Sequence, residues 1–251
     1  MIVIEDLATR PDLREPALAL GGVGGEFLRH DLAGLLAKSS HLAARWPEYF
    51  LVLLKDDVPV ARAAAVPVGF PTPERPELPD HGWDAALIWA AEDLLSTRET
   101  KTLIALEVMV APGRRGGGLA TKALEALKKR ASETGMRKLV VPVRPAGKEN
   151  APGLSFEDYI ARRRADGLPE DPWLRTHERV GARFVKVAPF AMTVTGIFAQ
   201  WKAWTGVDLR DGLTAVPGGI APVLASSALD LGVYVEPNVW LEYLVDQPGT
   251  C

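Results

Sequence analysis

Three consecutive glycines, Gly116–Gly118, stand between an apolar segment and a segment with helical periodicity, and Arg114 and Arg115 precede them directly. The first N–H groups of a helix lack intrahelical acceptors, and the helix dipole adds partial positive charge at the same end. Because glycines have no Cβ, an anion can approach these amides closely, while the arginines add bidentate donors. The stretch therefore predicts a binding site for a phosphate or a pyrophosphate.

Two common phosphate-binding motifs do not match this stretch. A Walker loop requires lysine and then serine or threonine after its last glycine, where Leu119 and Ala120 stand. A dinucleotide-binding fingerprint requires a third small residue at fixed spacing and an acidic residue about 20 positions later, and neither is in place. The glycines therefore belong either to another kind of phosphate-binding loop or to a glycine-rich turn that only connects two elements.

The segments around the glycines predict one strand–loop–helix–strand unit. Residues 102–110 are almost continuously apolar, which is typical of an interior strand. A helix is predicted from the glycines to about Thr134, with Glu125 and Lys129 as an ion pair on its solvent-facing side. Residues 138–143 predict the next strand, and a crossover of this kind places it parallel to the first.

The rest of the chain predicts further strands and helices in a single domain. A hairpin is expected over 49–68, with Asp56 and Asp57 at its turn. Asp171 and Pro172 are the residue types expected at the start of a short helix. The other predicted elements are strands at 2–7, 182–194 and 232–244, helices at 11–20, 26–44, 82–97 and 196–206, and a bend at 21–25.

The composition is that of a globular protein and predicts a cytoplasmic location. The chain has 251 residues, 24% of them charged, and a net charge of −3. We find no apolar run long enough to cross a membrane and no signal peptide, so no membrane partner is expected. The single cysteine, Cys251, excludes an internal disulfide framework and a cysteine-based zinc site, and no metal is expected.

The glycine loop resembles the acyl-CoA loop of the GCN5-related N-acetyltransferases, the GNAT superfamily. The family pattern is Q/R-x-x-G-x-G/A, and this chain has Arg115-Gly116-Gly117-Gly118-Leu119-Ala120 at the corresponding positions. The preceding Val110-Ala111-Pro112 is also similar to the family. The order of elements over about 1–144 is also similar, and the similarity returns at 172–181. The resemblance implies an α/β fold with a central mixed sheet and a splayed strand pair, flanked by helices. It further implies one domain over 1–251, with an insertion at about 145–171 and a C-terminal elaboration at about 196–251, as in a bacterial subgroup with an extended C-terminus.

The resemblance implies an acyltransferase that moves an acyl group, acetyl by default, from acyl-CoA directly to the amine of a small molecule, as in specialised metabolism. Backbone groups at the end of the strand would pair with the pantetheine arm, and the amides of the loop would hold the pyrophosphate. The residues assigned to acyl-CoA in this way are Val108, Met109, Val110, Arg115, Gly116, Gly117, Gly118, Leu119, Ala120 and Thr121. The arm would lie between the splayed strands, where Pro142 removes little strand pairing.

Three residues are the candidates for proton transfer. Glu107 lies in the otherwise apolar strand and is the expected base, unless it is instead an ordinary glutamate paired with an arginine at the edge of the core. Glu236 is a second candidate for the base. His177 takes the position where the family often has a proton-donating tyrosine, and a histidine can donate a proton near neutral pH. The alternative is an ordinary surface or capping histidine.

Basic residues in the insertion leave other functions open. Arg162, Arg163, Arg164 and Lys148 form either a solvated face or a basic rim for an anion, such as the 3′-phosphate of CoA, an acidic substrate or RNA. Some proteins of this fold take their acyl group from aminoacyl-tRNA, so such a transferase is a second hypothesis, which the net charge disfavours. A non-catalytic CoA-binding module is a third, because Pro142 replaces a glutamate common in the family. A monomer and a homodimer both remain open.

Overall fold

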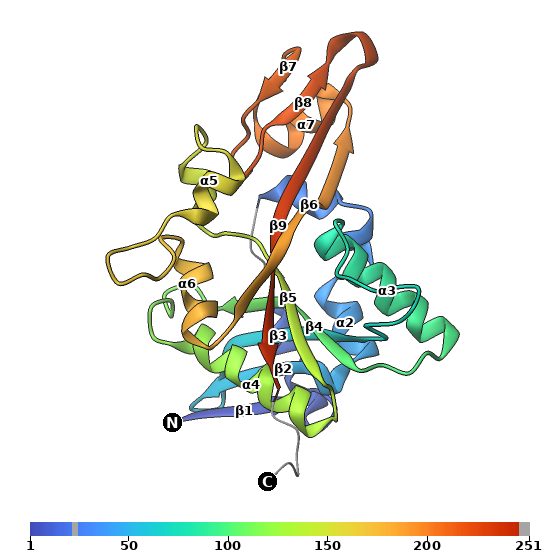
Figure 1. Ribbon diagram of the computed structural model, residues 1–251, viewed down its shortest axis with the longest axis vertical. Coiled ribbons are helices and arrows are strands. Elements are labelled where there is room, and N and C mark those ends of the chain that lie inside the picture. The colour runs from blue at the N-terminus through green and yellow to red at the C-terminus, as the bar shows by residue number, and fades with distance from the viewer. Residues whose placement is uncertain (22–24, 246–251) are drawn as a thin grey trace.

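The computed structural model describes residues 1–21 and 25–245, and a nine-stranded mixed sheet runs through it (Figure 1). The strands follow the order β1–β2–β3–β4–β5–β9–β8–β7, and β6 also pairs with β9. Among the strands of the described residues, only β4 and β5 are parallel neighbours, as the crossover predicts. The strands are β1 (Ile2–Asp6), β2 (Phe50–Lys55), β3 (Val58–Val68), β4 (Thr102–Val110), β5 (Lys138–Val143), β6 (Arg183–Gly196), β7 (Gly212–Thr214), β8 (Val223–Ser226) and β9 (Leu231–Leu244).

Helices cover both faces of the central strands, because buried side chains alternate between the two faces along each strand. One face packs against α4 and α6, and the other packs against α1, α2 and α3. Beyond the central strands, a long arm of β6–β9 packs on α7 and the short helix η2 (Glu26–His30) around the buried Trp201 (Figure 1). The helices are α1 (Arg14–Leu18), α2 (Ser39–Arg45), α3 (Gly82–Ser96), α4 (Leu119–Glu133), α5 (Phe156–Ala161), α6 (Pro172–Arg179) and α7 (Phe198–Thr205).

The predicted hairpin is confirmed as β2 and β3. Asp56 and Asp57 form its two-residue turn with φ values of 53° and 60°. Both values lie in the left-handed region that a tight hairpin turn requires, and aspartate is one of the few residue types that adopt it. The turn sets the register of β2 against β3, and the other edge of β3 pairs with β4.

The β4–β5 pair opens like the splayed pair that the resemblance implies. The two strands are paired only at three positions, from Thr102 opposite Lys138 to Ile104 opposite Val140. Beyond that point β4 keeps its antiparallel partner β3, and β5 keeps its antiparallel partner β9. Pro142 lies past the last β4–β5 pair, so its missing N–H removes no bond between these two strands.

The expected N-terminal helices are shorter than predicted. Residues 11–20 form a short 3-10 helix followed by α1, and residues 26–44 form η2 (Glu26–His30), η3 (Ala33–Leu35) and most of α2. The carboxylate of Asp31 accepts the N–H of Ala33 at 3.0 Å, which competes with a continuous helix at this point. Residues 22–24 of the predicted bend lie outside the described residues. The short strands β7 and β8 were not predicted.

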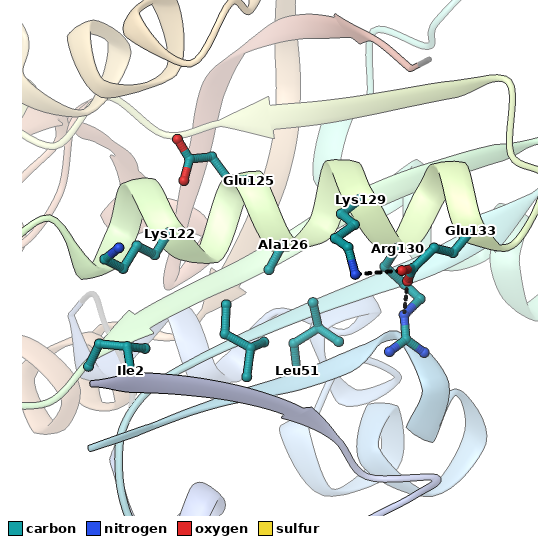
Figure 2. Close-up of a pocket in the computed structure, with 9 residues that line it drawn as sticks. Ile2, Leu51, Lys122, Glu125, Ala126, Lys129, Arg130 and Glu133 are labelled. Carbon is teal, nitrogen blue, oxygen red and sulfur yellow. Dashed lines mark ion pairs between the residues drawn. The ribbon is translucent and has the colours of Figure 1, made fainter. Parts of the chain in front are cut away.

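On the exposed side of α4, the expected pair of Glu125 with Lys129 is wrong. Lys129 instead forms an ion pair with Glu133 at 2.6 Å, and Figure 2 shows Glu125 pointing away from it. Arg130 also reaches Glu133 and binds Asp6 of β1 at 2.7 Å. Lys129, Arg130 and Glu133 line a hollow between α4 and the β1–β2 edge of the sheet. The ion pair of Arg130 with Asp6 joins this side of α4 to the sheet edge. Within the described ranges, no helix combines the length and the apolar character needed to cross a membrane.

Candidate active site

The glycine loop exposes the backbone at the start of α4. Gly116 and Gly118 have φ values of +83° and +73°, in the left-handed region that other residues rarely adopt, and a Cβ at either position would meet nothing within 4 Å. Lys122 is the first residue of the helix whose N–H binds a carbonyl, that of Gly118 at 3.1 Å. Among the described residues, the amides of 115–121 have no intramolecular acceptor. The loop therefore presents a row of free donors.

The charge of the loop suits the same anion. Arg114 and Arg115 are exposed, and no acidic side chain of the described chain pairs with either. The first turn of α4 also contains no acidic residue that would offset the helix dipole. The residues that are present thus fit a pyrophosphate at this helix start.

The free edge of β4 leads from this loop into the sheet. Ala111 donates its N–H to Val60 at 2.9 Å, and hydrogen-bonded pairs alternate along an antiparallel ladder. Met109 therefore bonds to β3 across from Arg62, whereas the backbone groups of Val108 and Val110 point toward the missing β5 partner. For Met109 this corrects the expected pairing with a pantetheine arm, because its backbone is already used in the sheet.

A β-bulge lies where the two strands separate. Glu107 pairs with Ala64 and Ala105 pairs with Ala65, so Leu106 is an extra residue in β4. The carbonyl of Leu106 accepts a hydrogen bond from Trp83 Nε1 at 3.2 Å. The bulge directly follows the last β4–β5 pair, so it forms the closed end of the opening between the strands.

Glu107 is held by three donor atoms. Arg62 donates to both carboxylate oxygens, through Nε to Oε1 and through Nη2 to Oε2 at 3.1 Å, and Ser39 Oγ donates to Oε2 at 3.0 Å. Arg62 is buried and also binds the carbonyls of Ala17 and Gly21. The arginine pairing anticipated as an alternative is therefore present. The side chain of Glu107 keeps 19% of its surface exposed, on the face covered by α2 and α3.

His177 lies in the core on the opposite face of the sheet. Its side chain is fully buried, its Nδ1 lies 2.6 Å from Tyr243 Oη, and its Nε2 has no partner among the described residues. Burial lowers the pKa of His177 to about 3. Tyr243 pairs with Leu139, in the half of β5 that is still joined to β4. The structure thus does not support His177 as the proton donor, because it is neutral at physiological pH and lies away from the opening.

Two buried aspartates near the bulge were missed by sequence analysis. Asp84 lies in the first turn of α3, and Asp31 lies between η2 and η3. The two carboxyl groups lie close enough for each to shift the pKa of the other, and Asp31 Oδ2 and Asp84 Oδ1 have no hydrogen-bond partner among the described groups. Burial, reinforced by Asp31, raises the pKa of Asp84 to about 9. The only sequence signal was an acidic residue at a helix start, which is usually a simple helix-stabilising feature.

The carboxylate of the second candidate base, Glu236, is already paired with an arginine of the chain. It is completely buried in β9, where Arg144 donates to both of its oxygens at 2.9 and 3.0 Å and the Tyr234 hydroxyl donates at 2.6 Å. Arg144 directly follows β5 and also binds the carbonyl of Gly218. Glu236 therefore joins the end of β5 to the arm instead of presenting a free carboxylate.

The basic residues of the insertion do not form a free cationic rim. Arg162 pairs with Glu170 at 2.8 Å, Arg163 pairs with Glu178 at 2.7 Å, and Arg164 lies 3.5 Å from Asp166. Lys148, in contrast, is buried and donates to the carbonyl of Ala151 at 3.0 Å, and burial lowers its pKa. These contacts favour the solvated face over a phosphate-binding rim. The predicted cap is confirmed, since Asp171 accepts the N–H groups of Trp173 and Leu174.

Comparisons with known proteins agree with this geometry. Residues 25–153 match the model of the acetyltransferase (GNAT) family. The chain is 34% identical over 220 residues to the arginine N-acetyltransferase avaD of Aspergillus versicolor, covering 77% of this chain and 75% of that protein. The loading GNATL domain of CurA from Lyngbya majuscula has a TM-score of 0.61 at 15% identity, with 98% of each chain covered. The GphF GNAT-like decarboxylase, solved with isobutyryl-CoA, has a TM-score of 0.54 at 18% identity, covering 98% of this chain and 100% of that one.

Proposed function

The chain belongs to the acetyltransferase (GNAT) family, and from that premise we propose that this N-acyltransferase uses acetyl-CoA as its donor and arginine, or a small amine bearing a guanidinium group, as its acceptor. The observation that carries the donor assignment is a set of unused backbone donors in the loop and along β4, interrupted at 111–114. It begins with the free amides of 115–121, continues along Val108 and Val110, and ends at the bulge of Leu106.

Each part of this set has a role in holding the donor. The loop amides and Arg115 bind the pyrophosphate, and the backbone groups of Val108 and Val110 take the place of the absent β5 partner in pairing with the pantetheine arm. The thioester carbonyl then lies near the bulge, where backbone N–H groups stabilise the negative charge that develops on its oxygen. The opening between β4 and β5 determines where the arm ends and therefore where transfer occurs.

We propose that Glu107 is the base for this direct transfer. The acceptor ammonium gives up one proton to Glu107, and the free amine attacks the thioester carbon. The carbon–sulfur bond then breaks, and the second proton lost from the nitrogen passes to the leaving thiolate. Glu107 adjoins the bulge, and Arg62 and Ser39 fix the orientation of its carboxylate. No acyl-enzyme is required, and the fully buried His177 takes no part in the proton transfers.

Arginine as the acceptor is supported by the relative that is 34% identical, which is an arginine N-acetyltransferase. Acidic side chains near the bulge suit a cationic acceptor of this kind. The ion-paired Arg162, Arg163 and Arg164 give less support to aminoacyl-tRNA as the donor. We also propose that the enzyme is cytoplasmic. Because all nine described strands join one sheet, we propose that the chain folds as one domain over 1–251.

A single assay tests this function. The purified protein is incubated with acetyl-CoA and arginine, free thiol is measured, and N-acetylarginine is identified by mass spectrometry. We expect thiol release that depends on arginine, together with binding of CoA in calorimetry. Binding of CoA without turnover over a broad panel of amines would instead support the non-catalytic module, and absence of CoA binding would reject the donor assignment.

A further inference from the structure

The Asp31–Asp84 pair carries a negative charge that no resident cation balances. Asp31 accepts the N–H of Ala33 at 3.0 Å, and the backbone groups of Gly34 and Thr193 lower the pKa of Asp31 and Asp84 respectively, against the effect of burial. The side chains acting on Asp84 are Asp31 and the more distant Glu236 of β9, and neither is basic. Two carboxylates in contact and away from water cannot both ionise, so the pair must hold either a proton or a cation.

The other acids around the opening differ in this respect. Glu107 is paired with Arg62, and Glu236 is paired with Arg144. In both cases an arginine of the chain supplies a planar group of N–H donors to the carboxylate. Asp31 and Asp84 lack such a partner among the described residues, and each has an oxygen without a donor. The pair is therefore the acidic site at which a guanidinium from outside the chain would find unused acceptors.

The pair is linked to the proposed point of transfer through Trp83, the residue before Asp84. Asp84 follows Trp83, whose indole N–H binds the carbonyl of Leu106 at the bulge. Gly34 lies between Asp31 and Trp83, since a Cβ built at Gly34 would be 3.5 Å from Asp31 Cβ and 3.6 Å from the Trp83 ring. Both residues are buried, with 9% of Asp84 and 1% of Asp31 exposed, and their two unpartnered oxygens lie below the surface, so a ligand would reach the pair only after a local opening of the structure.

We propose that the Asp31–Asp84 pair is the recognition site for the guanidinium group of the acceptor, which takes the place of the proton that the two carboxyl groups otherwise share. The inference rests on the proposed function, because it assumes a cationic acceptor at the bulge. It makes both aspartates specificity-determining residues and leaves proton removal to Glu107. Guanidinium N–H groups would then satisfy Asp31 Oδ2 and Asp84 Oδ1, the two oxygens without a donor.

Citrulline provides a matched test, because it keeps the amine and the length of arginine but carries a neutral urea. We expect the wild-type enzyme to prefer arginine by roughly 100-fold in kcat/KM, since a site built for a polar group rejects the analogue that lacks it. Asp84→Asn and Asp31→Asn should reduce this preference below about tenfold while CoA affinity stays unchanged. Asp80→Asn, which removes an exposed partner of Lys186, should keep the full preference. Folded Asp84→Asn and Asp31→Asn enzymes that retain the wild-type preference would overturn the inference.

A measurement on the wild-type protein avoids any folding defect of the variants. Arginine and citrulline are titrated into the CoA complex in two buffers with different ionisation enthalpies, near neutral pH. We expect arginine to release about one proton per site and citrulline none, because the cation replaces the shared proton. Binding of arginine without proton release would overturn the inference even if arginine is acetylated. Absence of acetyl transfer to any amine would instead reject the proposed function.

Discussion

Arg62 on β3 and Glu107 on β4 form a two-bond ion pair across neighbouring strands, on the face of the sheet covered by α2 and α3. Arg62 also holds the carbonyls of Ala17 and Gly21 and the hydroxyl of Ser39. The proposed base is therefore part of a buried network that orients it and also fixes the N-terminal segment. A change at Glu107 should affect both chemistry and stability, and the two effects can be measured separately.

Glu107→Gln keeps the shape of the side chain and removes its charge. We expect kcat to fall by at least about 100-fold, as is typical when a general base is lost, with CoA affinity unchanged. We also expect the free energy of unfolding to fall by up to about 3 kcal/mol, because Arg62 is left buried with a neutral partner. Kinetics on the folded protein and urea unfolding check the two effects. A variant that is destabilised but fully active would show that Glu107 is a structural ion-pair partner only.

Gly118→Val should weaken CoA binding through the shape of the loop. The substitution places a branched side chain where φ is +73°, so we expect a loss of about 1–2 kcal/mol in stability and at least tenfold weaker CoA binding. Gly135→Val is the matched control, because Gly135 at the other end of α4 has φ of +72° and equally open surroundings. It should lose similar stability without losing CoA affinity. Equal CoA affinity in the two variants would show that the pyrophosphate site lies elsewhere.

The alternation along β4 predicts different outcomes for two proline variants. Val110→Pro removes an N–H that faces the opening, so it should raise KM for acetyl-CoA by about tenfold, the value of one hydrogen bond, with a small change in Tm. Met109→Pro removes an N–H bonded to β3, so it should lower Tm strongly. Thermal unfolding and initial rates distinguish the two residues. A large loss of stability in Val110→Pro would mean that its N–H is used within the sheet.

The glycine loop, the strand before it and the β2–β3 hairpin could be predicted because their signals are local. Glycines at a helix start, an apolar strand before them and an Asp-Asp turn each depend on a few neighbouring residues. The opening of β4 from β5 was expected only from the family resemblance, and Pro142 was consistent with it. The Asp31–Asp84 contact could not be predicted in this way, because packing between η3 and α3 decides it. Asp84 alone resembles an ordinary acidic residue at a helix start.

The expectation for His177 failed for a related reason. Its place relative to Gly181 matches the family's tyrosine position, but a sequence position does not report burial. In the structure Glu107 and His177 belong to opposite faces of the sheet, and His177 contacts Tyr243 and Trp173 in the core. A residue placed in this way should influence stability as a function of pH and have no effect on the pH profile of transfer.

The lowered pKa of His177 gives the sign of that pH dependence. Burial lowers the value from 6.5 to about 3, so below pH 6.5 the unfolded chain binds a proton that the folded chain does not. The stabilising contribution is complete above pH 6.5 and is lost as the pH falls toward 3, by about 1.4 kcal/mol per pH unit. Urea unfolding across this range should show the slope in the wild-type protein and a shallower one in His177→Gln. The pH profile of kcat should be the same in both; an altered profile in the folded variant would restore His177 as a proton donor.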